Sequence, residues 1–232
     1  MLKRYFAGLL TAVLLAADLV ANAQVQTMLA PSAPKNLLKI APLGWVHGQL
    51  PFSTESRLGY ERVVGPRSGV AGSYSYLGTN HPFSFLGSAA LSGFISTAFT
   101  AAGHPAVVWT DVRIRTRGWR WQVQYKHYLS KKQTAPEGFY LSPHFSYTSA
   151  DYRIEAKDFD AAIELKTERR NYNLLAGYQT VLGRHFVVDV FTGLGYRDNT
   201  TKAYNRTGAY LDTMPRGTKL KLSSGLNIGW AF

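Results

Sequence analysis

The last fourteen residues of the chain, 219–232, restrict its possible folds more than any other stretch. They read KLKLSSGLNIGWAF, so apolar side chains alternate with polar or small ones, and the segment ends on an aromatic residue. Successive side chains of a β-strand point to opposite faces, so the alternation predicts one apolar face and one polar face. A strand between lipid and a polar interior has this pattern, whereas a soluble sandwich would turn the apolar face to a core. The apolar set is even-numbered and consists of Leu220, Leu222, Leu226, Ile228, Trp230 and Phe232.

The N-terminus has the organisation of an export signal. Lys3 and Arg4 precede an apolar run, residues 5–17, and Ala21 and Ala23 form a small-x-small cleavage site. The run is shorter than the roughly 20 apolar residues that a membrane-spanning helix needs, so we expect cleavage rather than a retained anchor. The chain is thereby divided into a signal peptide (1–23), a short periplasmic leader (24–35) and a single domain (36–232).

Composition excludes several classes of protein. The chain has no cysteine, which rules out a disulfide framework, a thiolate metal site and a lipid anchor on an N-terminal cysteine. The formal net charge is +12, but no basic stripe is interleaved with stacking aromatic residues, so we expect no nucleic-acid partner. Two explanations of the positive charge remain. The basic residues bind lipopolysaccharide phosphates, or they only lie at membrane interfaces and in solvated loops. The six histidines lack ligand spacing, and we expect neither a metal nor a cofactor.

Segments of the same alternation recur along the chain and predict about eight strands. The turns at Gly65, Ser130 and Gly183 are shorter than most of the other connections. Short turns on one side and long loops on the other are typical of outer-membrane proteins, so we expect a closed antiparallel up-and-down transmembrane β-barrel in a Gram-negative outer membrane. The predicted strands are 36–48, 54–64, 69–77, 106–126 with a bulge or break at Gly118, 139–147, 171–182, 186–197 and 219–232.

Three of the predicted loops have a marked character of their own. Residues 151–170 are rich in charge of both signs and predict a solvated loop or a hairpin that projects into water, and residues 198–217 predict a polar loop. The uncharged segment 82–103 places apolar residues at helical spacing, opposite serines and a threonine. We therefore expect an amphipathic helix in a long extracellular loop, at the barrel mouth or on the outer leaflet, with a transmembrane helix as the alternative. The expected apolar face is Leu91, Phe94, Ile95, Ala98, Phe99 and Ala102.

Several motifs together resemble a small uncharacterised outer-membrane β-barrel family of Bacteroidota, similar in size to the OmpA barrel. They are KNLLKIAPL, LGYERVVGPRSGV, YKHYLSKK, APEGFYLSP, AGYQTVLGRHFVVDVFTGLGYR and GLNIGWAF, and the resemblance covers nearly all of residues 35–232. It implies an eight-stranded barrel that the barrel-assembly machinery inserts. The insertion signal is typically a terminal strand that ends in Phe, and Ile228, Trp230 and Phe232 match it. An acidic residue is common in such families where this chain has Gln124, and we expect no peptidoglycan-binding domain after the barrel.

The inward faces of such a barrel are expected to hold paired polar side chains. An eight-stranded barrel is only wide enough for side chains to fill, and buried charges are costly unless they are paired. We therefore expect Glu61 and Asp189 to neutralise the basic residues of the lumen, which is a structural role rather than a catalytic one. The predicted polar network of the lumen is Arg57, Glu61, Arg120, Gln124, Lys126 and Asp189.

The strongest enzymatic signal is the sequence His144-Phe145-Ser146. It resembles the His-x-Ser core of outer-membrane phospholipases and lipid A deacylases, in which a histidine activates a serine two residues away on the same strand face. Tyr147 stands where those families usually have Asn, and the expected register turns His144 away from lipid. We therefore expect a non-enzymatic protein with a structural or surface-interaction role through its extracellular loops. A lipid hydrolase centred on His144 and Ser146 is one alternative, and a soluble periplasmic lipid-binding barrel is another.

Overall fold

The computed structural model describes residues 34–46, 48–103, 111–130, 134–156, 161–214, 217 and 219–232. The expected signal peptide, its cleavage site and most of the expected leader therefore lie outside the described residues. The described part is mostly antiparallel β-sheet with few helices. Its elements are β1 (Asn36–Ile40), α2 (Leu43–Val46), β2 (Ser53–Gly65), β3 (Ser68–Thr79), α3 (His81–Ala101), β4 (Val112–Tyr128), β5 (Gly138–Ala156), β6 (Ala161–Leu182), β7 (Phe186–Asn205), β8 (Tyr210–Met214) and β9 (Leu220–Ala231).

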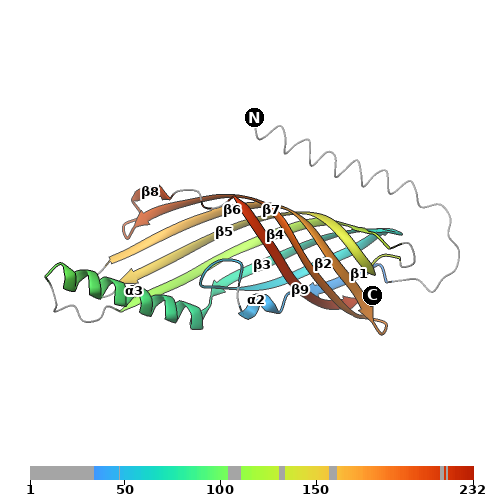
Figure 1. The fold of residues 1–232 in the computed structure, drawn as a ribbon, viewed down its shortest axis with the longest axis horizontal. Helices are drawn as coiled ribbons and strands as arrows, with labels where there is room; N and C mark the ends of the chain where they lie inside the picture. The colour runs from blue at the N-terminus through green and yellow to red at the C-terminus, as the bar shows by residue number, and fades with distance from the viewer. Residues whose placement is uncertain are drawn as a thin grey trace, which may run out of the picture.

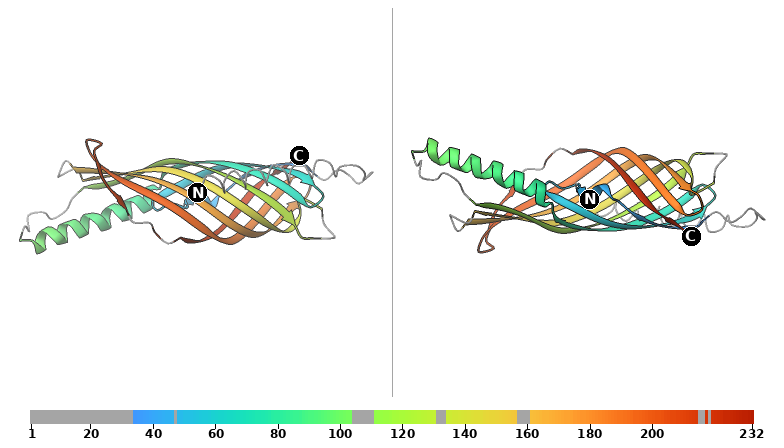
Figure 2. Two further views of the ribbon diagram at one scale, coloured as in Figure 1. Left: turned by 90° about the horizontal axis from the view of Figure 1, so that it is seen from above. Right: turned by 90° about the horizontal axis from the view of Figure 1, so that it is seen from below.

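Eight of the strands form an antiparallel sheet that closes into a ring, as Figures 1 and 2 show. The strands follow one another in the order β1-β2-β3-β4-β5-β6-β7-β9, and β9 pairs again with β1. The backbones of Asn36 and Phe232 complete the closure, because each N–H donates to the carbonyl oxygen of the other, at 3.0 and 2.8 Å. The short strand β8 pairs with β7 alone. The expected eight-stranded antiparallel sheet is thus confirmed as a ring.

The two ends of the ring differ in their connections. One end, here called the turn end, holds the β2–β3, β4–β5 and β6–β7 connections together with Phe232. The opposite end, the loop end, holds α2, α3 and β8, and there β4 to β7 extend well past the other strands (Figure 1). Strand β5 has 19 residues and β6 has 22, against 12 in β9. Short connections therefore gather at one end, as the sequence predicts.

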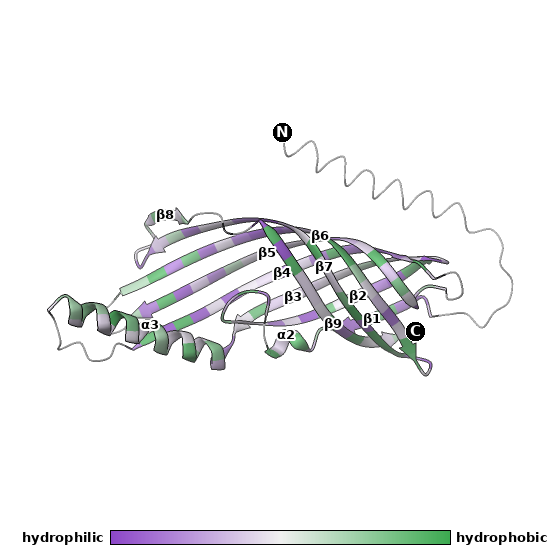
Figure 3. Ribbon diagram, viewed as in Figure 1, coloured by the Kyte–Doolittle hydropathy of each residue, from purple (hydrophilic) through white to green (hydrophobic). Residues whose placement is uncertain are grey.

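Side chains alternate between the inside and the outside of the ring along each strand. In β9 the even-numbered Leu220 and Leu222 are 68% and 69% exposed, whereas the neighbouring odd-numbered Lys221 and Ser223 are buried. The predicted orientation of this strand, even-numbered residues outward and odd-numbered residues inward, is confirmed. Figure 3 shows the same alternation of hydrophobic and hydrophilic residues along the other strands.

The first strand is shorter than the alternation suggests. The prediction of a strand over residues 36–48 is wrong beyond Ile40, because the chain leaves the sheet at Ala41 and Pro42 and forms α2. Proline lacks an N–H to donate to a ladder and its φ suits the start of a helix, which explains the change of direction. Gly48 then donates to the carbonyl oxygen of Ser53 at 2.7 Å and leads the chain into β2.

Strand β4 runs through Gly118 without the predicted bulge. Its register against β5 is constant from Val112 to Tyr128. Val112 and Ile114 are buried inside the ring, whereas Trp119 and Val123 point outward, so the apolar face changes sides while the strand continues. The glycine has a packing role instead, because a Cβ at this position would lie 2.4 Å from the carbonyl oxygen of Ser149 on β5.

The long connections contain more regular structure than the sequence indicates. Residues 151–156 and 161–170 lie in the paired strands β5 and β6, so the described part of this segment is a hairpin rather than a loop. The expected polar loop 198–217 is largely strand, because β7 continues to Asn205 and β8 folds back on it. Inside this extension Leu50, Leu77, Ala150 and Tyr152 form a small apolar cluster, against which Leu165 packs.

The predicted helix is present as α3. Asn80 caps it by accepting a bond from the Phe83 N–H, and the helix contacts β4. The hydroxylated face is the one that packs on the protein, because the two buried residues are Ser84 and Ser92, while Phe85 and Phe94 are 72% and 71% exposed. The hydroxyls of the buried serines bond to carbonyl oxygens of the same helix, so this small face can pack without unpaired polar groups. By length and composition alone, α3 qualifies as a membrane-spanning helix.

Candidate functional site

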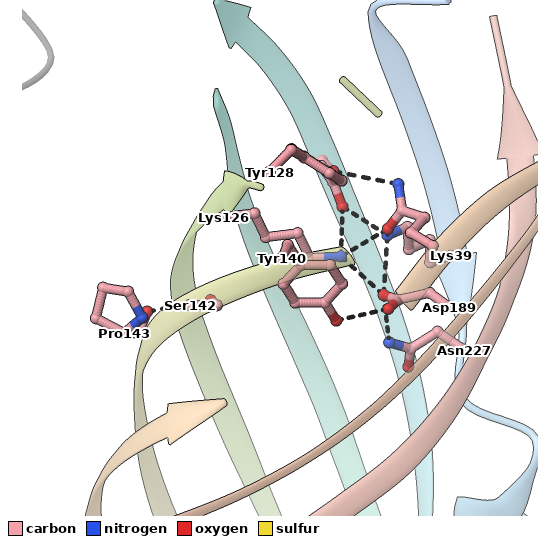
Figure 4. A network of polar contacts seen from close by, with 10 residues as sticks. Lys39, Lys126, Tyr128, Tyr140, Ser142, Pro143, Asp189 and Asn227 are labelled. Carbon is pink, nitrogen blue, oxygen red and sulfur yellow. Dashed lines mark hydrogen bonds and ion pairs between the residues drawn. The ribbon is translucent and has the colours of Figure 1, made fainter. Parts of the chain in front are cut away.

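The most extensive polar site lies inside the ring, near the turn end (Figure 4). Its centre consists of two lysines and two carboxylates, all buried. Lys39 Nζ lies 3.1 Å from Asp189 Oδ2, and Lys126 Nζ lies 2.8 Å from the same oxygen and 3.0 Å from Glu61 Oε2. The charges balance within this group. We define the turn-end network as Lys39, Glu61, Lys126, Tyr128, Tyr140, Gln179, Asp189 and Asn227.

Each charged group in the turn-end network is fully supplied with hydrogen bonds. Lys126 donates to Gln179 Oε1 and Asp189 Oδ2 and pairs with Glu61, so its three N–H groups have three partners. Lys39 likewise contacts Glu61, Gln179 and Asp189. A buried ion pair is retained without a large penalty only when the remaining lone pairs and protons are also satisfied. The network meets that condition with residues from seven of the eight strands of the ring.

Two tyrosines complete the turn-end network. The Tyr128 hydroxyl donates to Glu61 Oε1 at 2.7 Å, and the Tyr140 hydroxyl donates to Asp189 Oδ1 at 2.6 Å. The Lys126 ammonium also lies 4.2 Å from the centre of the Tyr140 ring, within the range of a cation–π contact. Space for the Tyr140 phenol comes from Gly177, because a Cβ there would lie 2.5 Å from the Tyr140 hydroxyl oxygen.

A second polar group lies nearer the loop end. Glu55 Oε1 accepts bonds from Arg57 Nη2 at 2.7 Å and from Ser75 Oγ at 2.8 Å, and its Oε2 accepts from Arg120 Nη1 at 2.6 Å. Arg120 Nε donates to Thr148 Oγ1 at 2.7 Å. We call these five residues the loop-end network. One carboxylate here serves two guanidinium groups, so this network carries a net positive charge.

Neutral polar side chains occupy the level between the two networks. The ring nitrogens of His144 lie 3.2 Å from Gln122 Oε1 and 2.9 Å from the amide nitrogen of Asn173. Ser146 Oγ accepts a bond from Asn171 Nδ2 at 3.0 Å. A cavity of about 40 Å³ lies at this level and is lined in part by His144, Gln122 and Gln124. A volume of that size holds only a few water molecules.

This geometry does not assemble a nucleophile and a base. Both ring nitrogens of His144 bond to amide side chains, and the partner of Ser146 is Asn171. Ser146 is also buried inside the ring, on the side opposite the outward faces of the strands. Activation of a serine requires the base within hydrogen-bond reach of its hydroxyl, and that contact is not among the bonds that these residues make.

The structure brings most of the sequence-predicted interior residues together, and Lys126 pairs with Glu61 and Asp189 as expected. Arg57, Glu61, Arg120, Lys126 and Asp189 all face the inside, and Gln124 lines the cavity. The expected pairing of Arg57 and Arg120 with Glu61 and Asp189 is wrong, because both arginines pair with Glu55. Sequence reasoning missed Lys39 and Glu55. Glu55 shares the odd-numbered face of β2 with Arg57 and Glu61, so the alternation could have identified it.

Within the described ranges, no group of three or more histidine, aspartate and glutamate residues is placed to hold a metal ion. No protein-family model matches the chain, and no curated protein matches it in sequence. The class of the molecule is therefore defined by its own geometry, which is a closed ring of eight antiparallel strands around a polar, ion-paired interior.

Proposed function

We propose that the chain is an outer-membrane β-barrel with a filled polar lumen, and that it has a structural or surface-interaction role through the loop end. The observation that carries this proposal is the inverted distribution of polarity across the ring. At the level of the turn-end network, buried lysines and carboxylates fill the inside, while leucines, valines and aromatic residues cover the outside. A lipid-facing wall around a polar lumen has this arrangement.

The outward apolar surface ends abruptly toward the loop end. On β4 the outward residue Trp119 is followed by Arg117, and on β6 Tyr172 is followed by Arg170. On β5 the outward residues beyond Tyr147 are Ser149 and Asp151. The border residues on these strands are aromatic, as in the girdles where membrane proteins meet water. The parts of β4, β5 and β6 beyond the border therefore belong in water.

The height of the apolar surface fits a bilayer. Strand β7 presents apolar residues or threonine outward at each alternate position from Phe186 to Tyr196. Ten residue steps at ~3.4 Å each, tilted by roughly 40°, span about 26 Å along the barrel axis. The apolar band of membrane barrels is about 25 Å tall. We define the apolar band as the outward face of the ring between its two borders of aromatic residues.

Aromatic contacts mark both borders of the band. Toward the loop end, the rings of Trp119 and Tyr147 lie with their centres 5.4 Å apart. Toward the turn end, Phe139 and Tyr178 are 4.8 Å apart, and the rings of His185 and Trp230 stack at 4.9 Å. Amphipathic aromatic side chains are favoured where a surface is apolar on one side and hydrated on the other.

The two alternatives fit the structure less well. A soluble lipid-binding barrel needs an apolar interior for its ligand, whereas Lys39, Glu61, Lys126 and Asp189 fill this one. A hydrolase centred on His144 and Ser146 needs a serine that meets lipid, and Ser146 is buried in the lumen. The residues that would do the chemistry are held by neighbouring amides.

The proposal fixes an orientation and a set of partners. The turn end faces the periplasm and the loop end faces the cell exterior, since outer-membrane barrels have short periplasmic turns. Outer-membrane lipids surround the band, and Arg117 and Arg170, just beyond its border, are placed to meet lipopolysaccharide phosphates. The barrel-assembly machinery would insert the chain by its last strand, after cleavage of the signal peptide. The Bacteroidota barrel family remains the resemblance that accompanies this proposal.

The test compares arginine substitutions at two depths on one strand. Val190 lies near the middle of the band on the outward face of β7, and Thr200 lies outward on the same strand beyond its border. In lipid vesicles we expect Val190→Arg to lower the free energy of unfolding by about 2–4 kcal/mol and Thr200→Arg to change it by less than about 1 kcal/mol. Folding is followed by heat-modifiable gel mobility. Equal small effects at both positions, or a folded protein that stays in solution without detergent, would contradict the proposal.

A further inference from the structure

The lumen on the loop side holds more positive charge than its own carboxylates neutralise. Arg169, Arg197 and Lys221 face inward from β6, β7 and β9, at the level of the loop-end network. Among the described residues Glu55 is the one carboxylate that faces inward there. We define the lumen cation cluster as Arg57, Arg120, Arg169, Arg197 and Lys221, which sets four guanidinium groups and one lysine amino group against one carboxylate.

The members of the cluster act on one another electrostatically. Lys221 interacts with Arg120, Arg169 and Arg197, and the opposite charge among its main interactions is that of Glu55. Arg120 interacts in turn with Arg57 and Arg169. Like charges that share a partly dry site repel one another strongly unless an opposite charge is present.

Apart from Glu55, the polar partners of the cluster are neutral or missing. Lys221 Nζ donates to Gln49 Oε1 at 2.8 Å, and Arg169 Nε donates to Asn199 Oδ1 at 3.2 Å. Arg197 Nε is buried and has no hydrogen-bond partner, and the same is true of the Tyr152 hydroxyl. Burial raises the pKa of Tyr152 to about 12, so this hydroxyl stays protonated and able to donate. Unused buried donors are rare in folded proteins and indicate an absent acceptor.

An anion is the acceptor that would also offset the excess positive charge, which a neutral water molecule would not. Guanidinium groups present planar pairs of N–H donors that match the oxygens of phosphate or sulfate. Arg57 and Arg120 are held by Glu55, whereas Arg169, Arg197 and the Lys221 amino group are available, together with the Tyr152 hydroxyl. We propose that the lumen cation cluster binds a multivalent oxyanion of the phosphate or sulfate class, which enters from the loop end. The inference depends on the closed ring and not on its insertion into a membrane.

The test measures anion binding by the folded, detergent-solubilised chain. Sodium phosphate and sodium sulfate are titrated calorimetrically at an ionic strength held constant with sodium chloride. We expect saturable binding to the wild-type protein. In Arg197→Gln the affinity should be about tenfold lower, because a charge-assisted bond is lost. The matched control is Lys202→Gln, which removes a positive charge from the outward face of the same strand and should leave the affinity unchanged. Arg169→Gln serves as a second test variant.

Two outcomes would overturn the assignment. One is the absence of saturable phosphate or sulfate binding, and the other is an equal loss of affinity in Lys202→Gln and Arg197→Gln, which would indicate a general charge effect. Heat-modifiable mobility shows for each variant that the ring is folded, so that lost binding is separated from lost structure. A folded ring that binds no oxyanion rejects this inference alone, whereas failure of the depth comparison at Val190 and Thr200 rejects the membrane proposal alone.

Discussion

Lys126 Nζ on β4 lies 2.8 Å from Asp189 Oδ2 on β7, so one ion pair joins two strands that are separated by β5 and β6 in the ring. Asp189 also accepts bonds from Lys39 on β1 and Asn227 on β9. The bridge therefore crosses the lumen rather than following its wall. Contacts of this kind hold the cross-section of the ring in one shape.

Replacement of Lys126 by methionine is expected to destabilise the protein strongly. The change preserves most of the side-chain volume but leaves Glu61 and Asp189 with one cation between them, and removal of one partner from a buried pair costs about 3–5 kcal/mol. The measurement is the free energy of unfolding in guanidinium chloride with the protein in lipid vesicles. Lys202→Met, on the outward face of β7 beyond the band, should change it by less than about 0.5 kcal/mol. Similar values for the two variants would show that the pair is not a structural bridge.

Replacement of Glu55 by glutamine is expected to disrupt the loop-end network. Arg57 and Arg120 would lose their common carboxylate, and about 3 kcal/mol of stability should be lost in the same unfolding assay. Glu168→Gln, on the outward face of β6 beyond the band, is the matched control. Added phosphate should restore part of the loss in Glu55→Gln only, because the anion would replace the missing charge. Full stability of Glu55→Gln without phosphate would contradict the role assigned to this carboxylate.

A methyl group at position 177 is expected to displace the Tyr140 phenol. In Gly177→Ala the new Cβ would lie 2.5 Å from the Tyr140 hydroxyl oxygen and 2.7 Å from the Val190 carbonyl oxygen, so the tyrosine must move away from Asp189. Overpacking of this kind costs about 1–3 kcal/mol. Gly72→Ala is the control, since the nearest atom to its Cβ would be 3.9 Å away. The cost of Gly177→Ala should fall when Tyr140 is already phenylalanine, and strictly additive effects would argue against this coupling.

Replacement of Phe232 by alanine is expected to impair assembly more than stability. The backbone of Phe232 closes the ring by bonding to Asn36, and this contact does not require the aromatic side chain. The side chain is exposed at the end of the last strand, where the assembly machinery would recognise it. We expect severalfold less heat-modifiable protein in outer-membrane fractions, with the refolded protein losing less than about 1 kcal/mol. Leu222→Ala, an exposed residue of the same strand, should assemble normally.

The alternation of side chains predicted the wall of the ring well, because the side-chain period of a strand is a local property. The faces of β9 and the positions of the short turns follow from it directly. The bulge predicted at Gly118 shows its limit. The apolar residues of β4 change from the inward to the outward face there, while the register is constant. The pattern therefore predicted a break in the backbone where only the environment of the two strand faces changes.

The interior could be predicted only in part, since its contacts join residues far apart in the chain. The alternation indicates that Arg57, Lys126 and Asp189 point inward, but which cation meets which carboxylate depends on the stagger of the strands around the closed ring. Lys39 and Gln179 meet across 140 sequence positions. Pro42 also obscured the register of the first strand, which concealed Lys39.

Because β1 is short, the ladders of hydrogen bonds that join neighbouring strands of the ring differ in length. Strand β9 pairs with β7 over residues 220–230 but with β1 only from Ile228 to Ala231. On the loop side of Ile40, β1 no longer pairs with β9, and Lys221 of β9 instead donates to Gln49 in the segment that leads into β2. The backbone amides of β9 that face this segment should exchange with solvent deuterium sooner than those paired with β7. At the junction of β1 and β9, main-chain pairing thus covers only the turn end of the ring, and side-chain contacts join the wall beyond it.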